Sequence, residues 1–295
     1  MSRPRSRWIV VSPGRDHAAW CEAILAAAAQ QGQQAVILSP DAPPTEGGTI
    51  ICDDLDLARS SAAAEDIAVL PLEPFIDLTG CETDDEINAR VIDTSRKIGT
   101  ALSAEQAGSR FAATINGKMR LQDLSITVPK GGEAKGSAKE EALARACAVY
   151  RNDEAQWSGA VFNFDPRNKV SAPTLGELDV TGRPRFLVSG PYLLMPSGRW
   201  RATIRLSFDH HLSRAGFRVD WGGVETYASH EFHPQRSGVF ELALDHHWEA
   251  PASAELRVLV LEGVFHGAMT FHGATIERVR SRGSRSFRTS DASAS

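Results

Sequence analysis

Five side chains in the second half of the chain are of the types that contact sugars. Arg183, Arg185 and Tyr192 flank one apolar run, and Glu262 and His266 bracket a glycine in a later turn. Guanidinium, carboxylate and imidazole groups exchange hydrogen bonds with hydroxyls, and aromatic faces stack on the C–H surfaces of sugar rings. These five residues are the candidate carbohydrate-binding residues. A Glu262–His266 pair that only holds the turn is the structural alternative.

Acidic residues form a second candidate site. Asp53, Asp54 and Asp56 follow a short apolar run, and Asp84–Glu86 opens a predicted helix. Neighbouring carboxylates can bind Mg²⁺ or act as acid and base, as a glycan-modifying enzyme requires. Carboxylates in these positions also cap helices and offset the helix dipole. The capping interpretation is favoured, and an enzyme that uses Asp53, Asp54 or Glu262 is kept as the alternative.

No metal site, cofactor site or catalytic set is predicted. The pairs His210–His211 and His246–His247 consist of neighbours that point to opposite faces of a strand, and no Cys or His has zinc-ligand spacing. The segment Ser12–His17 lies where a strand meets a helix, which suits a nucleotide or sugar phosphate. It contains one glycine and no phosphate-binding motif, so an ordinary turn is favoured there.

Residues 1–108 alternate between short apolar runs and helix-like segments. The predicted strands are residues 7–12, 35–38, 49–52 and 67–70, and the predicted helices are residues 17–31, 55–64 and 84–102. Asp16 and Gly32 are the expected ends of the first helix, and Thr83–Glu86 fits a capping box for the last. An apolar face is predicted on this last helix, formed by Ile87, Val91, Ser95, Ile98 and Leu102. Strands alternating with helices predict a small parallel α/β layer.

Residues 109–157 connect this layer to a different pattern. A hairpin is predicted from residues 111–115 and 121–128, and a helix at 140–150. From residue 158 to 280 the apolar residues alternate with polar ones. The predicted strands are residues 161–165, 177–180, 186–189, 199–208, 217–221, 238–244, 254–262 and 268–279. Short alternating strands cut by turns predict an antiparallel β-sandwich, with Trp200, Trp221 and Trp248 in its core. Residues 281–295 are expected to be a disordered tail.

Composition limits the classes of function. The formal net charge of −5 argues against nucleic-acid binding. No apolar run is long enough for a transmembrane segment, and the first one is too short for a signal peptide. The four cysteines have no Cys-x-x-Cys spacing, so buried reduced thiols are expected. We therefore expect a cytoplasmic protein, with peripheral contact to the inner membrane as a further option.

Three segments carry a resemblance to a known family. Gly182–Thr203, Phe217–Trp221 and Leu261–Gly267 resemble the β-sandwich modules attached to bacterial polysaccharide-biosynthesis proteins and glycosyltransferases. Those modules are similar to jelly-roll carbohydrate-binding domains. The resemblance covers residues 178–279. It implies a jelly-roll-like sandwich with a carbohydrate or polysaccharide ligand, and a glycan-synthesis protein as a possible partner. The first half is Rossmann-like only in its alternation of elements.

Three hypotheses follow. The first is a non-catalytic accessory protein of bacterial surface-polysaccharide metabolism whose sandwich binds carbohydrate. The second is a glycosyltransferase-like or glycan-modifying enzyme. The third is a structural module that associates with itself. Binding to a glycan favours the first, turnover that is lost in Asp53→Ala favours the second, and concentration-dependent light scattering favours the third.

Overall fold

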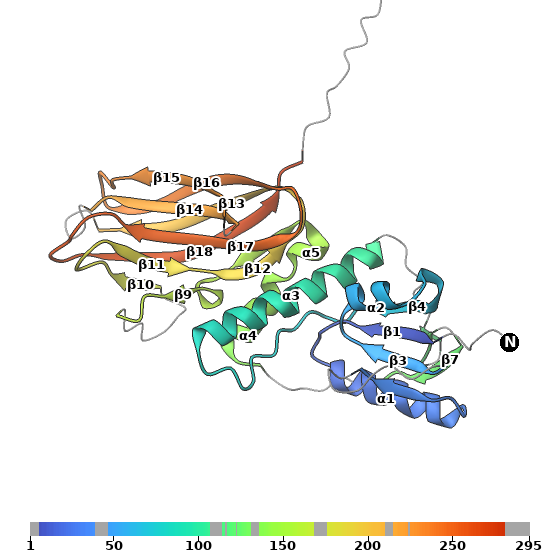
Figure 1. Ribbon diagram of the computed structural model, residues 1–295. Coiled ribbons are helices and arrows are strands. Elements are labelled where there is room, and N and C mark those ends of the chain that lie inside the picture. The colour runs from blue at the N-terminus through green and yellow to red at the C-terminus, as the bar shows by residue number, and fades with distance from the viewer. Residues whose placement is uncertain are drawn as a thin grey trace, which may run out of the picture.

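The computed structural model describes residues 6–38, 47–106, 114–115, 117–121, 123–130, 136–167, 176–209, 215–223 and 225–280. The chain is rich in strands and combines a small parallel sheet with several antiparallel sheets (Figure 1). Four predicted features lie wholly or partly outside the described residues: the pair His210–His211, the start of the hairpin at 111–113, Asn116 in its turn, and the tail at 281–295.

Four parallel strands form the sheet of the first half, in the order β2-β3-β1-β4. They are β1 (Arg7–Val11), β2 (Ala35–Ile37), β3 (Thr49–Cys52) and β4 (Ile67–Leu70). The four predicted strands are therefore confirmed. The central strands β1 and β3 are almost wholly buried, as expected for a sheet that is covered on both faces.

Helices cover the two faces of this sheet. Trp20 and Ile24 of α1 (His17–Gln30) pack on one face. Leu55 and Ala58 of α2 (Leu55–Ser61) pack on the other, together with the last turns of α3 (Asp84–Gln106). The helices that follow the neighbouring strands β1 and β3 thus lie on opposite faces.

The helix ends show which sequence signals were correct. Asp54 caps α2, since its carboxylate accepts from the amides of Asp56 and Leu57. Thr83 and Glu86 form the predicted capping box of α3. Asp16 stands at the start of α1 but makes no capping hydrogen bond with its side chain, so that detail was wrong. Helix α2 is shorter than predicted, and a 3₁₀ turn (Ala64–Asp66) precedes β4.

The connecting segment folds into three short strands and two helices. Strands β5 (Thr114–Ile115), β6 (Lys118–Leu121) and β7 (Leu124–Thr127) form an antiparallel sheet whose last strand packs on α1. The predicted hairpin is present in part: β5 and β6 pair on either side of the predicted turn, but the second strand was misplaced, because the chain turns again between β6 and β7. The predicted helix is divided into α4 (Ala138–Ala146) and α5 (Val149–Asn152).

Two antiparallel sheets form the second half. The first contains β8 (Glu154–Trp157), β10 (Glu177–Asp179), β13 (Gly198–Phe208), β16 (Gly238–Trp248) and β18 (Ala268–Arg278). The second contains β9 (Asn163–Phe164), β11 (Arg185–Ser189), β12 (Pro191–Met195), β14 (Phe217–Gly223), β15 (Tyr227–Phe232) and β17 (Ala252–Val260). The sequence did not predict β8, β12 or β15. Of the strand predicted at residues 161–165, only the two-residue β9 is present.

The space between these sheets is filled by aromatic and aliphatic side chains. Trp157, Trp200 and Trp221 are fully buried and Trp248 is nearly so, which confirms the predicted core role of the tryptophans. Trp221 meets both Trp157 and Trp248 edge to face, with ring centroids 5.6 and 5.1 Å apart. Such edge-to-face pairs are a favourable geometry for aromatic rings in a core.

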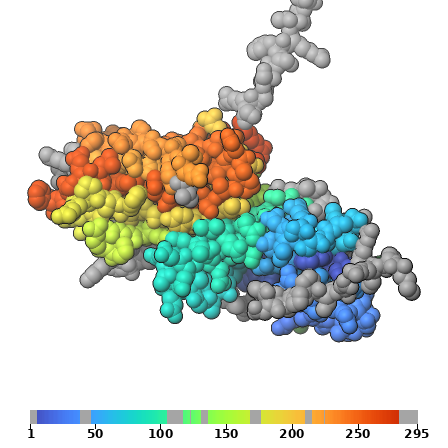
Figure 2. Space-filling view, in the orientation of Figure 1, coloured from blue at the N-terminus to red at the C-terminus, as the bar shows by residue number. Residues whose placement is uncertain are grey.

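Helix α3 joins the two halves. Its apolar face, Val91, Ile98 and Leu102, belongs to the same buried cluster as the sandwich core. The amide of Leu194 in β12 donates to the hydroxyl of Ser95 at 3.0 Å. Figure 2 shows the teal atoms of this helix between the yellow-to-orange sandwich and the blue α/β layer. Within the described ranges, no helix has the length and apolar character that a membrane span needs.

Candidate functional site

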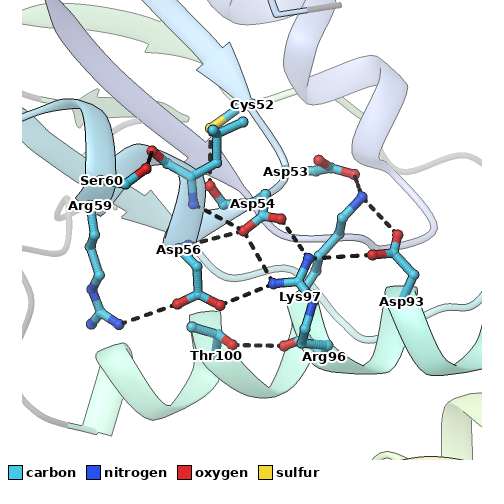
Figure 3. A network of polar contacts seen from close by, with 11 residues as sticks. Cys52, Asp53, Asp54, Asp56, Arg59, Ser60, Asp93, Arg96, Lys97 and Thr100 are labelled. Carbon is cyan, nitrogen blue, oxygen red and sulfur yellow. Dashed lines mark hydrogen bonds and ion pairs between the residues drawn. The ribbon is translucent and has the colours of Figure 1, made fainter. Parts of the chain in front are cut away.

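The acidic residues after β3 are neutralised by cations of α3 (Figure 3). A guanidinium nitrogen of Arg96 lies 2.5 Å from Asp54, and a second nitrogen lies 3.0 Å from Asp56. The ammonium of Lys97 donates to Asp53 at 2.9 Å. Each of the three carboxylates after β3 therefore has a cationic partner from α3.

Hydrogen bonding decides the charge state of Asp54. Burial alone would raise the pKa of this carboxyl, but the hydrogen bonds from Arg96 and from the amides of the first turn of α2 hold it below its ordinary value. An ionised, capped and ion-paired carboxylate is suited to hold α2 against α3. In the part of the chain that the structure describes, no three His, Cys, Asp or Glu side chains are grouped so that they could hold a metal ion.

The five predicted carbohydrate-binding residues separate into two groups. Arg185 and Tyr192 line a cleft of about 390 Å³ beside β11, which we call the sandwich cleft. Arg183, Glu262 and His266 lie at or beside the turn before β18, because Gly182 forms a bridge with Val264 of that turn. The structure therefore does not bring the five together in one site.

Arg185 is a structural residue at the edge of the sandwich cleft. Its guanidinium pairs with Asp165, which is almost fully buried, and donates to the carbonyls of Asp179 and Val180. The side chain of Arg185 is 9% exposed. A ligand in the cleft would meet a guanidinium whose donors are already occupied.

Tyr192 also lines the cleft, and its backbone conformation is unusual. Its φ is 67°, a left-handed value that bulky residues rarely adopt. The hydroxyls of Tyr192 and Tyr227 both donate to the carboxylate of Glu255, at 2.9 and 2.5 Å. Burial, together with this carboxylate, raises the pKa of Tyr192 to about 12. Tyr192 is thus a fixed, neutral phenol.

The turn before β18 has a different arrangement from the one predicted. The carboxylate of Glu262 lies 2.9 Å from Nε2 of His233, so its partner is His233 and not His266. His233 follows β15, and it is distant from Glu262 in the sequence. Both side chains are more than half exposed. Phe265, in the same turn, is 98% exposed.

Amide groups form the polar part of the sandwich cleft. Asn163 of β9 and Asn88 of α3 both line it, and Nδ2 of Asn163 donates to Oδ1 of Asn88 at 3.0 Å. The ammonium of Lys139 donates to Oδ1 of Asn163 at 2.9 Å. Burial lowers the pKa of Lys139, and the charge of Asp84 partly opposes that effect. The two amides are therefore held in place from three elements, β9, α3 and α4.

Phe186 is the cleft residue that sequence reasoning missed. The register of β11 against β17 shifts between Phe186 and Val188, so the alternation of buried and exposed residues is broken there. Phe186 is 49% exposed, although it lies in an apolar run. The guanidinium of Arg257 lies 5.3 Å from the ring centroid, and the buried Asp220 holds that guanidinium with two hydrogen bonds. The aromatic surface is therefore both exposed and fixed.

Comparisons with known proteins found solved structures that are similar to part of this chain. No protein-family model matches the sequence, and no curated protein matches it. Similar solved structures include TmCBM61 in complex with β-1,4-galactotriose, at 10% identity and a TM-score of 0.29, over 44% of this chain and 84% of that chain. The Family 16 Carbohydrate Binding Module-2 matches at 11% identity and a TM-score of 0.26, over 38% and 81%. The CBM22-1 xylan-binding domain from Paenibacillus barcinonensis Xyn10C matches at 13% and 0.26, over 41% and 83%.

Proposed function

We propose that the chain binds carbohydrate in the sandwich cleft, as a non-catalytic accessory protein of bacterial surface-polysaccharide metabolism. One observation carries the proposal: Phe186 is 49% exposed in a cleft whose polar groups include two fixed amides and a fixed phenol. An exposed aromatic ring has no role in the sandwich core. A cleft that combines an apolar face with a few convergent polar groups is the usual form of a small-ligand site.

Sugars suit this combination better than other small ligands. The ring of Phe186 offers an apolar face to sugar C–H groups, and Asn88 and Asn163 offer both donors and acceptors for hydroxyls. Arg185 pairs with Asp165, and the charge of Asp84 is opposed by that of Lys139, which bonds to Asn163, so little net charge is left to attract an ionic ligand. A neutral oligosaccharide is therefore the ligand class that the cleft favours.

The remaining parts of the proposal concern location and partners. Cys21, Cys52 and Cys147 are buried free thiols, which supports a cytoplasmic site where thiols stay reduced. A glycan-synthesis protein is the proposed partner of the α/β layer, and peripheral contact with the inner membrane is compatible with this role. The sandwich, from β8 (Glu154–Trp157) to residue 280, is proposed as the binding module.

Calorimetric titration of the full chain with a panel of neutral and acidic oligosaccharides tests the proposal. We expect saturable binding of at least one neutral member. Phe186→Ala should weaken it at least about tenfold, or ~1.4 kcal/mol, because the stacking surface is lost. Folding should be little affected, since the side chain is half exposed.

Two matched variants serve as controls. Phe265→Ala removes an exposed phenylalanine from the turn before β18, where the second group of candidate residues lies, and should leave the affinity unchanged. Tyr192→Phe and Tyr227→Phe each remove one hydroxyl that donates to Glu255. Tyr227 does not line the sandwich cleft, so only Tyr192→Phe should weaken binding. If no oligosaccharide binds, or if Phe265→Ala alone abolishes binding, the sandwich cleft is not the site.

A further inference from the structure

A second cleft lies on the α/β half, at the ends of β1 and β3. It measures about 480 Å³, and we call it the sheet-end cleft. Its lining includes Gly14 and Arg15, which follow β1, and Asp53, which follows β3. Because the helices after these two strands cover opposite faces of the sheet, the cleft lies at a switch point of the topology. Crevices at that position are where open α/β sheets bind ligands.

Thr94 of α3 provides an independent sign of a ligand. This threonine lines the sheet-end cleft and is 9% exposed, yet its hydroxyl makes no hydrogen bond with any residue that the structure describes. Other hydroxyls of α3 behave differently: Thr100 and Ser103 both donate to the carbonyl four residues earlier, at 2.8 Å. A hydroxyl inside a helix usually bonds in that way. The hydroxyl of Thr94 is therefore available to a ligand inside the cleft.

Arg90 places a positive charge one helical turn from Thr94. Residues four apart lie on the same side of a helix, and both line this cleft. The guanidinium of Arg90 makes one long hydrogen bond, 3.4 Å, to the carbonyl of Asp77. Among the described residues no carboxylate lies within ion-pair distance of it. Arg15, by contrast, pairs with Glu141 and lies over the ring of Phe75.

Three carboxylates line the cleft, and each accepts hydrogen bonds from other residues of the chain. Asp53 accepts from Lys97, and Glu140 accepts from the amides of Leu78 and Ser137. Asp77 is exposed, and its carboxylate accepts from the hydroxyl and the amide of Thr79. These two bonds, together with the charge of Arg90, hold the pKa of Asp77 below its ordinary value, so the carboxylate is ionised and can accept from hydroxyl groups.

We infer that the sheet-end cleft binds a sugar phosphate, with Arg90 and Thr94 on the phosphate and Asp77 on the sugar hydroxyls. The planar guanidinium of Arg90 matches phosphate oxygens, and the hydroxyl of Thr94 donates to the same group. His17 and Ala18, in the first turn of α1, also line the cleft, and the N-terminus of this helix adds partial positive charge. This site is separate from the sandwich cleft and does not depend on the function proposed for it.

Titration calorimetry on the full chain tests this assignment with glucose 1-phosphate, galactose 1-phosphate and mannose 1-phosphate. At least one should bind saturably, and at least tenfold more tightly than the unphosphorylated sugar or inorganic phosphate. Thr94→Val keeps the shape of the side chain and should weaken binding about threefold to tenfold, the range for one hydrogen bond. Arg90→Gln removes a charged donor and should weaken it at least about tenfold.

The matched control is Thr100→Val, the same substitution on the same helix at a hydroxyl that already bonds to the helix and does not line this cleft. It should leave the affinity unchanged. Phe186→Ala should also leave it unchanged, which separates this site from the sandwich cleft. Absence of binding by all three sugar phosphates would overturn the inference. Equal affinities of Thr94→Val and Thr100→Val would overturn the assigned contact, and inorganic phosphate binding as tightly as the esters would overturn the sugar part.

Discussion

At the scale of single residues, the fold raises the pKa of every tyrosine in the chain. The chain has three, Tyr150, Tyr192 and Tyr227. Burial raises the pKa of Tyr150 well above its ordinary value. Burial also raises the pKa of the other two, and the carboxylate of Glu255 adds to the effect, so that Tyr192 reaches about 12. All three phenols are therefore neutral in the folded chain until the pH is strongly alkaline.

This predicts an unusual alkaline titration. The tyrosinate absorbance should stay flat as the pH passes about 10, where a free tyrosine ionises, and should rise only on unfolding or well above that pH. Because the folded pKa values are raised, the stabilisation is complete below about pH 10 and is lost as the pH rises through the folded values. A native chain in which one tyrosine titrates near pH 10 would contradict the hydrogen bonds to Glu255.

The candidate residues show how far sequence can predict a site. Tyr192 was identified because it flanks an apolar run, and it does line the sandwich cleft. Phe186 was missed because its exposure results from a register shift in β11, which no local pattern announces. Glu262 pairs with His233, which follows β15, and a long-range contact of that kind has no signal in sequence spacing.

At the scale of elements, α2 and α3 are held together by Asp54 and Arg96. Asp54→Ala should lower the free energy of unfolding by about 1–2 kcal/mol, because α2 loses its cap and Arg96 loses its shortest ion pair. Urea denaturation measures this. Asp54→Asn should retain part of the stability, since Asn caps helices as well as Asp does.

The control is Asp56→Ala, which removes a carboxylate that is 53% exposed and should cost less than about 0.5 kcal/mol. The pKa of Asp54 is lowered on folding, so its charge stabilises the fold above about pH 4, and the stabilisation is lost as the pH falls through the folded value. The difference between Asp54 and Asn should therefore shrink in acid. Equal losses for Asp54→Ala and Asp56→Ala would contradict this account.

Helices and strands were predictable where the spacing of apolar residues along the chain determines them. The alternation of β13 and the apolar face of α3 both appear in the structure as predicted. Strand β12 was missed because Gly190 and Pro191 at its start are typical of a turn. The helical period of α3 predicted a buried face, but it could not show that this face packs on the sandwich.

At the scale of the whole molecule, α3 is the element that the two clefts share. Asp84 and Asn88 line the sandwich cleft, and Arg90 and Thr94 line the sheet-end cleft. The apolar face of the same helix is buried against the sandwich core. Both proposed sites are thus built partly on one helix that packs against both the sandwich core and the parallel sheet.

A crystal structure of the full chain with a bound neutral oligosaccharide tests the central proposal most directly. The proposal predicts a sugar ring stacked on Phe186, with hydroxyls within hydrogen-bond distance of Asn163 or Tyr192. A sugar bound instead at the turn that carries Phe265 and His266, with the sandwich cleft empty, would contradict it.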